Sequence, residues 1–128
     1  MPAPLDQLII DRLHVRPIIG IYPEERTNRQ DLIVSVTLDA DLRRACRSDD
    51  LADSIDYAAI KKKILDLAES SRFHLIERFA QAVADLALAD RRVRQVTVTV
   101  EKPGALRFAR SAGVTIRRQR RPSQRKTR

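Results

Sequence analysis

The sequence of 128 residues contains one cysteine, two histidines and no long run of apolar residues. Since Cys46 is the single cysteine, an intrachain disulfide cannot form and a thiolate metal site is excluded. His14 and His74 have no cysteine pair beside them, which argues against any metal site. These absences fit a protein of the reducing cytoplasm.

A membrane anchor is not expected from the sequence either. No stretch approaches the roughly 18 apolar residues that a membrane span requires. Residues 1–6 lack the basic region and apolar run of a signal peptide. The length and the 43% share of hydrophobic residues suit a single domain with one core. We therefore expect one soluble, unprocessed domain in the cytoplasm.

The excess of basic residues is concentrated at the C-terminus. The chain has 25 Lys and Arg against 17 Asp and Glu, a formal net charge of +8. Seven of the basic residues lie in RRQRRPSQRKTR, residues 117–128, which leaves 18 basic against 17 acidic residues elsewhere, a charge of +1. We divide the chain into a folded domain, residues 1–118, and a basic, disordered tail, residues 119–128. The tail is either solvated or an arm that contacts phosphates, and a nucleic-acid partner is not expected for the domain.

Four segments have the composition and alternation of β-strands. They are residues 8–15, 32–38, 93–101 and 113–117. Proline disfavours helix for the residue before it, so Lys102, which precedes Pro103, should be the last extended residue of the third strand. A polar loop of hairpin length, residues 21–29, joins the first two strands.

Two helices are predicted between the second and third strands. The first follows the cap oxygens of Asp53, Ser54 and Asp56, and the second spans about residues 75–89. This order of elements predicts an α+β fold, a four-stranded antiparallel sheet with two helices on one face. The other face would be polar, as suits the wet lining of a multi-subunit barrel. It carries Ser35, Thr37, Thr97 and Thr99.

Lys102 is the first candidate for chemistry. Period-two parity places it on the same face of its strand as Val96, Val98 and Val100, toward the helices. At the desolvated lip of an apolar face, burial would lower the pKa of this lysine toward the value that a general base needs. The alternative is an ammonium that reaches into water from the end of the strand.

Two further candidates lie at predicted helix starts. Glu77 is a carboxylate among apolar neighbours, and it could accept two parallel hydrogen bonds from a flat amidine-like edge such as that of a pterin. The alternative is that Glu77 only complements the helix dipole. Tyr57 is either a proton donor or a packing residue whose hydroxyl lies in water.

Several motifs together resemble the dihydroneopterin aldolase family of the folate pathway. They are Gly20-Ile21-Tyr22 with Glu24-Glu25, Ser48-Asp49-Asp50 through Asp56-Tyr57, Leu75-Ile76-Glu77-Arg78, and Lys102-Pro103-Gly104-Ala105. The resemblance covers about residues 8–117. It implies the tunnelling fold (T-fold), in which subunits close their sheets into a ring-forming barrel. The assembly would be a homo-oligomer, a tetrameric ring or an octamer, with active sites between neighbouring subunits.

The resemblance also implies a reaction and its residues. The family cleaves 7,8-dihydroneopterin into 6-hydroxymethyl-7,8-dihydropterin and glycolaldehyde, a metal-free retro-aldol reaction without a bound cofactor. The ring imine of the substrate would accept the electrons that other aldolases pass to a lysine imine or a metal ion. At the matching positions Lys102 would act as general base and acid, Tyr57 of an adjacent subunit would relay a proton, and Glu25 would lie near the reacting side chain. The residues that would bind the pterin ring are Leu75, Ile76 and Glu77.

Two other functions remain open at this point. Residues 105–110 and 28–31 also resemble the related dihydroneopterin triphosphate epimerases, in which cleavage is stopped midway and reversed. Arg107 and Arg110 could then meet a triphosphate. A hypothesis of another class is a non-enzymatic binding module whose basic tail engages nucleic acid or an acidic partner.

Overall fold

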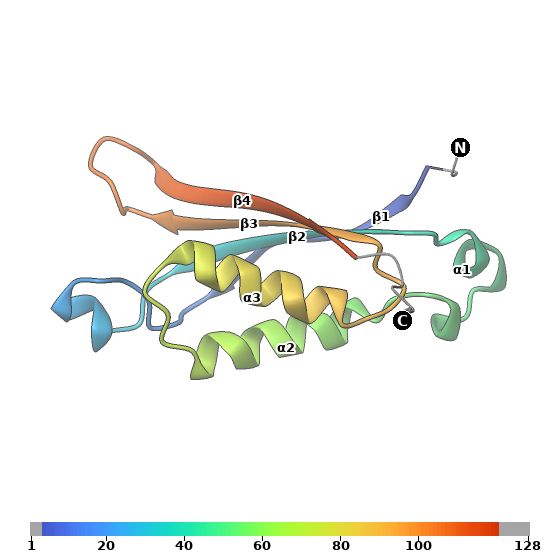
Figure 1. Ribbon diagram of the computed structural model, residues 1–128, viewed down its shortest axis with the longest axis horizontal. Helices are drawn as coiled ribbons and strands as arrows, with labels where there is room; N and C mark the ends of the chain where they lie inside the picture. The colour runs from blue at the N-terminus through green and yellow to red at the C-terminus, as the bar shows by residue number, and fades with distance from the viewer. Residues whose placement is uncertain (1–3, 121–128) are drawn as a thin grey trace, which may run out of the picture.

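The computed structural model describes residues 4–120, and it confirms the predicted α+β fold. The four strands form one antiparallel sheet in the order β1-β2-β3-β4, with α2 and α3 side by side under one face (Figure 1). Three short elements, η1, α1 and η2, were not predicted. The elements are β1 (Asp6–Val15), η1 (Pro23–Arg26), β2 (Leu32–Ala40), α1 (Arg43–Ser48), η2 (Leu51–Asp53), α2 (Tyr57–Ser70), α3 (Ile76–Leu88), β3 (Gln95–Pro103) and β4 (Ser111–Gln119).

The core lies between the sheet and the two helices. Alternate residues of β2 and β3 are fully buried and pair across the strands, for example Val36 with Val98 and Val34 with Val100. Phe79 and Val83 of α3 are fully buried against them, together with three alanines of the same helix. Burying each valine or phenylalanine side chain contributes about 1.5–3 kcal/mol. This core holds α3 and β3 together, and both elements supply residues of the pocket described below.

Strand β1 contains a bulge that the sequence did not predict. Ile10 pairs with Val36 and Leu13 with Val34, so two residues of β1 lie opposite Ser35. Arg12 takes a positive φ of 58° there, and its N–H donates to Ser35 Oγ at 3.0 Å. The extra residue brings Leu13 onto the same face as Ile10, which explains why the apolar spacing of this strand departs from a period of two.

The face of the sheet away from the helices is polar, as predicted. Thr99 and Thr115 lie opposite each other on β3 and β4, and their hydroxyl oxygens are 2.9 Å apart. Ser35 and Thr37 of β2 lie on this face as well. Strands β1 and β4 are the edges of the sheet within this chain. Closure of several such sheets into a ring stays a prediction.

The two ends of the molecule are formed by different elements. η1, the start of α3 and the end of β3 lie at one end, and the start of α2 lies at the other (Figure 1).

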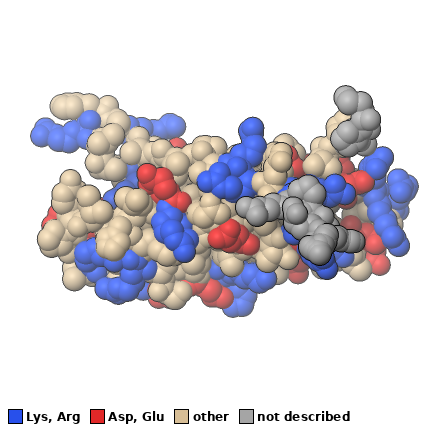
Figure 2. Space-filling view, viewed as in Figure 1, with Lys and Arg blue, Asp and Glu red and all other residues tan. Residues whose placement is uncertain are grey.

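Strand β4 runs to Gln119, and residues 121–128 of the expected tail lie outside the described residues. Figure 2 shows Lys and Arg spread over the visible face with Asp and Glu between them. Within the described part of the chain, no helix is both long and apolar enough to cross a membrane.

Candidate active site

A pocket of about 420 Å³ opens between the loop after β1, the start of α3 and the end of β3. This volume lies in the range of small-molecule sites in proteins. Five of the six predicted site residues line it, although they come from three segments far apart in the sequence. These five are Glu25, Leu75, Ile76, Glu77 and Lys102.

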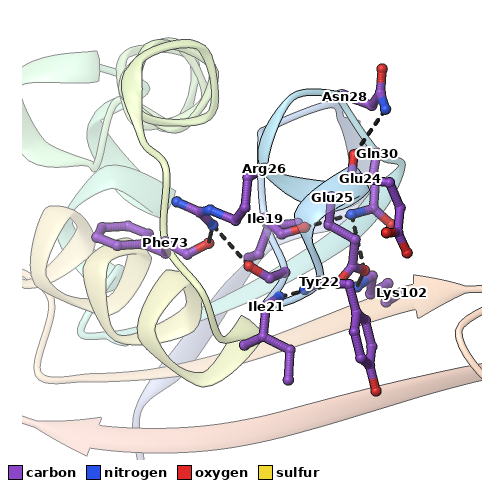
Figure 3. A network of polar contacts seen from close by, with 11 residues as sticks. Ile19, Ile21, Tyr22, Glu24, Glu25, Arg26, Asn28, Gln30, Phe73 and Lys102 are labelled. Carbon is purple, nitrogen blue, oxygen red and sulfur yellow. Dashed lines mark hydrogen bonds and ion pairs between the residues drawn. The ribbon is translucent and has the colours of Figure 1, made fainter.

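Lys102 and Glu25 form an ion pair on one side of the pocket (Figure 3). Lys102 Nζ lies 2.6 Å from Glu25 Oε2, and the two side chains are 18% and 17% exposed. Lys102 is extended and pairs with Ala112 of β4, and it faces the helix side of the sheet as parity predicts. The ammonium therefore does not point into bulk water, which was the alternative. The carboxylate partner of Lys102 was not predicted from the sequence.

Glu25 is held as an anion by four donors. Its Oε1 accepts from the N–H groups of Ile21 and Tyr22, each at 3.1 Å, and its Oε2 accepts from Lys102 and from Gln30 Nε2 at 3.2 Å. These bonds, above all the one from Lys102, lower the pKa of Glu25 to about 2. Glu25 is thus a fixed negative charge that orients the Lys102 amine.

Gly20 permits this arrangement because of its backbone conformation and its missing side chain. Its φ is +131°, a region that side chains disfavour. A Cβ atom at this position would lie 2.3 Å from Glu25 Cδ, so any other residue would displace the carboxylate. The glycine therefore leaves the space in which Glu25 folds back onto its own loop.

Sequence reasoning missed two residues that hold this loop. Gln30 donates to Glu25 and to the Ile19 carbonyl oxygen, and Arg26 donates to carbonyl oxygens of Gly20 and Phe73. Both are polar side chains in a segment that reads as an exposed loop, yet both are partly buried. The positions of Arg26 and Gln30 in the sequence follow neither a helical nor a strand period, so the sequence does not distinguish them from solvated residues.

Glu77 lies at the mouth of the pocket in the first turn of α3. It is exposed, and among residues 4–120 it has no hydrogen-bond or ion-pair partner. Leu75, just before the helix, is 52% exposed, and Ile76 packs partly against the core. The helix dipole favours the charge, and the carboxylate remains available to a ligand beside two apolar side chains.

Tyr57 is the one predicted site residue that the chain does not bring to the pocket. It is the first residue of α2 and its side chain is 57% exposed. The start of α2 lies at the end of the molecule opposite to the pocket (Figure 1). A contact between Tyr57 and this kind of pocket therefore requires a second copy of the chain.

The two arginines considered for a triphosphate do not line the pocket either. Arg107 lies in the connection between β3 and β4, where its guanidinium stacks on the fully exposed ring of Phe108 at 5.5 Å. Arg110 lines a different hollow, with Arg12 and Glu101. Within residues 4–120, no group of three His, Cys, Asp or Glu side chains could hold a metal ion.

Comparison with known proteins gives consistent matches over nearly the whole chain. The sequence model of the family FolB, dihydroneopterin aldolase, matches residues 8–117. Dihydroneopterin aldolase of Escherichia coli K12 is 39% identical over 114 residues, which cover 89% of this chain and 93% of that protein. Dihydroneopterin triphosphate 2'-epimerase of the same strain is 36% identical over 120 residues, 94% of this chain and 100% of that one. The chain spans 17% of the folic acid synthesis protein of Dictyostelium discoideum, at 36% identity.

Solved structures agree with these sequence matches. The FolB protein of Vibrio cholerae superposes with a TM-score of 0.87 at 37% identity, covering 91% of this chain and 98% of that chain. E. coli dihydroneopterin aldolase in complex with neopterin gives a TM-score of 0.84 at 39% identity, covering 88% and 98%. Dihydroneopterin aldolase of Burkholderia thailandensis bound to guanine gives 0.78 at 26% identity, covering 91% and 93%.

Proposed function

This chain belongs to the dihydroneopterin aldolase family, and we propose that its pocket binds 7,8-dihydroneopterin and cleaves the side chain of that substrate. The products would be 6-hydroxymethyl-7,8-dihydropterin and glycolaldehyde. The observation that carries the proposal is that Lys102, paired with Glu25, shares one pocket with Glu77, whose carboxylate has no partner within residues 4–120. The protein would work in the cytoplasm as a ring-shaped homo-oligomer.

Glu77 is suited to hold the flat edge of a pterin. A carboxylate accepts two parallel hydrogen bonds from an amino group and a neighbouring ring N–H, which pterins and guanine both present. The relatives solved with neopterin and with guanine support this choice of ligand. Leu75 and Ile76 would contact the ring, and the anchored ring would direct its side chain toward Lys102.

Lys102 supplies the proton transfers of a retro-aldol cleavage. Once the Lys102 ammonium has released its proton, the amine can accept the proton of the side-chain hydroxyl; the adjacent carbon–carbon bond then breaks, and its electron pair moves into the ring imine of the substrate. Glycolaldehyde leaves, and the lysine ammonium returns a proton to the remaining carbon. Glu25 stays ionised throughout and stabilises the ammonium that forms in the first step.

The proposal is tested by incubating the purified protein with 7,8-dihydroneopterin and measuring glycolaldehyde. Lys102→Ala should lower kcat by about 10²- to 10⁴-fold because the general base is lost, with neopterin binding retained. Glu77→Ala should weaken neopterin binding about 10- to 100-fold through the loss of charged hydrogen bonds. Lys62→Ala, at an exposed lysine on α2, is the control. Absence of glycolaldehyde, or full activity of Lys102→Ala, would contradict the proposal.

Epimerisation of dihydroneopterin triphosphate is the second candidate, because relatives with that name match at 36% identity and more. The same proton transfers would serve it if the cleaved aldehyde, which still carries the triphosphate, were retained and the carbon–carbon bond formed again. Arg107 and Arg110 do not line the pocket of their own chain, so a triphosphate bound there would have to meet arginines of a neighbouring copy. Assays with both substrates separate the two: conversion of the triphosphate to a stereoisomer without cleavage indicates the epimerase, and release of glycolaldehyde from 7,8-dihydroneopterin indicates the aldolase.

The binding-module hypothesis predicts that the basic tail, and not Lys102, is needed for function. If the tail were the functional part, removal of residues after Gln119 would abolish function and Lys102→Ala would be harmless. For the aldolase we expect function to be lost in Lys102→Ala and kept after removal of the tail. The mixed charges of the visible face support the enzyme over a nucleic-acid binder (Figure 2).

A further inference from the structure

The pocket has two walls that come from distant parts of the chain. One wall is the loop that carries Glu25, and the other is the segment that leads into α3 together with the first turn of that helix, which carries Glu77. We propose that Arg26 is a positioning residue that sets the gap between these walls. This inference rests on the proposed function, because the gap decides whether a ring bound at Glu77 can present its side chain to Lys102.

Arg26 joins the two walls by backbone contacts. Its Nη1 donates to the Gly20 carbonyl oxygen at 2.8 Å and to the Phe73 carbonyl oxygen at 2.9 Å. Its Nη2 donates to the Arg72 carbonyl oxygen at 2.5 Å. The Arg72 guanidinium returns a bond to the Arg26 carbonyl oxygen at 3.0 Å, and Gly20 N–H donates to Phe73. Figure 3 shows the guanidinium of Arg26 between the two segments.

Arg26 makes hydrogen bonds to backbone carbonyl oxygens of two segments and does not act through an ion pair. We call an arginine that ties two backbone segments in this way a brace. Among residues 4–120, no carboxylate lies within ion-pair distance of its guanidinium. A planar guanidinium can donate to three carbonyl oxygens at once, whereas a lysine ammonium at the same place would have a different geometry and a shorter reach. The chain therefore uses a partly buried arginine to tie two backbones together.

The residues that Arg26 holds lie close in the sequence to the residues proposed to bind and cleave the substrate. Gly20 directly precedes Ile21, whose N–H holds Glu25, and Glu25 in turn holds Lys102. Phe73 lies four residues before Glu77. If the loop moved away from Phe73, the distance from Glu77 to the Lys102 amine would change. A misplacement of about 1 Å at a reacting group costs about 10²-fold in rate.

Arg29 provides a matched control in the same loop. Its Nη1 donates to the Arg16 carbonyl oxygen at 2.9 Å, and its Nη2 donates to the Glu69 carbonyl oxygen at 3.1 Å. The guanidinium also lies 3.2 Å from the Glu69 carboxylate. These contacts tie the loop to the end of α2, and Arg29 does not line the pocket. Arg29→Gln thus removes a comparable brace without loosening the two walls.

The test measures kcat with dihydroneopterin and the Kd of neopterin. For Arg26→Gln we expect kcat to fall about 10- to 100-fold, while neopterin, held on the Glu77 wall, binds within about threefold of the unaltered protein. Arg29→Gln should keep both values within about threefold. Added guanidinium ion should restore part of kcat in Arg26→Ala and none in Arg29→Ala. Equal losses of kcat in the two glutamine variants, or a loss of neopterin binding as large as the loss of kcat, would overturn the inference.

Hydrogen exchange separates this inference from the proposed function. If the unaltered protein does not cleave dihydroneopterin, the proposed function fails, but the brace is still tested by the amide protons of Ile21 and Tyr22. In Arg26→Gln these amides and those of residues 74–77 should exchange faster, and in Arg29→Gln they should not. Unchanged exchange in Arg26→Gln would overturn the brace whatever the activity.

Discussion

Glu25 holds its own loop in place and, in the proposed function, would also take part in the chemistry. Its four donors come from its own loop, from Gln30 and from β3. Each bond stabilises the charged form, so the pKa is lowered from 4.5 to about 2. A carboxyl group with such a pKa does not exchange protons near neutral pH. In the proposed reaction the proton transfers are therefore assigned to Lys102, and Glu25 would orient its amine.

The lowered pKa of Glu25 predicts a pH-dependent contribution to stability. Because the folded-state pKa lies below the value of 4.5 in the unfolded chain, the contribution is complete above that value and is lost as the pH falls toward 2. At pH 6, Glu25→Gln should lower the free energy of unfolding by on the order of 2 kcal/mol. Urea denaturation between pH 2.5 and 6 would measure the difference from the unaltered protein, which should shrink at the acidic end.

The control for this experiment is Glu24→Gln. Glu24 is the exposed neighbour in η1, and its side chain has no ion pair among the described residues. The Glu24→Gln variant should follow the unaltered protein across the pH range. A difference between Glu25→Gln and the unaltered protein that stayed constant from pH 6 to 2.5 would contradict the role given to the Glu25 charge.

At the scale of elements, the start of α2 shows how a cap decides where a candidate side chain, Tyr57, lies. Three cap oxygens were candidates in the sequence, and the structure uses Asp56, whose side chain accepts from Ala59 N at 3.1 Å. Asp53 instead pairs with Arg44 at 3.1 Å, and Ser54 ends η2. Tyr57 is thereby fixed as the first helical residue.

The cap predicts a specific pattern of stability changes. Asp56→Ala should lower the free energy of unfolding by about 0.5–2 kcal/mol, because the N–H of Ala59 loses its acceptor. Asp56→Asn keeps an acceptor oxygen and should retain most of the stability. Urea denaturation of both variants would check this, and equal losses would show that the side-chain oxygen is not what matters.

At the scale of the whole molecule, the pocket and Tyr57 lie too far apart to serve one site within one chain. The pocket is at the η1 end and the start of α2 is at the other end (Figure 1). The polar face of the sheet and its two edge strands suit closure with further copies. Assembly would then bring Tyr57 of one subunit to the pocket of the next.

This arrangement predicts complementation between inactive subunits. Lys102→Ala and Tyr57→Phe subunits, each impaired alone, would be unfolded together and refolded as mixed rings. Random pairing in a closed ring should leave roughly one site in four with both residues intact, and cleavage should recover in proportion. Glycolaldehyde release would report it. Tyr57→Phe mixed with the double variant is the control, and no recovery in the first mixture would contradict the shared site.

The sequence by itself determined much of the local structure of this protein, namely its main strands and helices. The alternation in β2 and β3 and the apolar stripes of α2 and α3 each act within a few residues, so periodicity predicts them. The end of β3 was predicted at Lys102 and lies one residue later, at Pro103, which still pairs with Ser111. The contacts that make the site are of another kind. Glu25 and Lys102 are 77 residues apart, and Arg26 reaches Phe73 over 47 residues. Only the tertiary structure decides such pairs, because they depend on strand register, on the bulge in β1 and on the paths of loops, and none of these leaves a repeating pattern in the sequence.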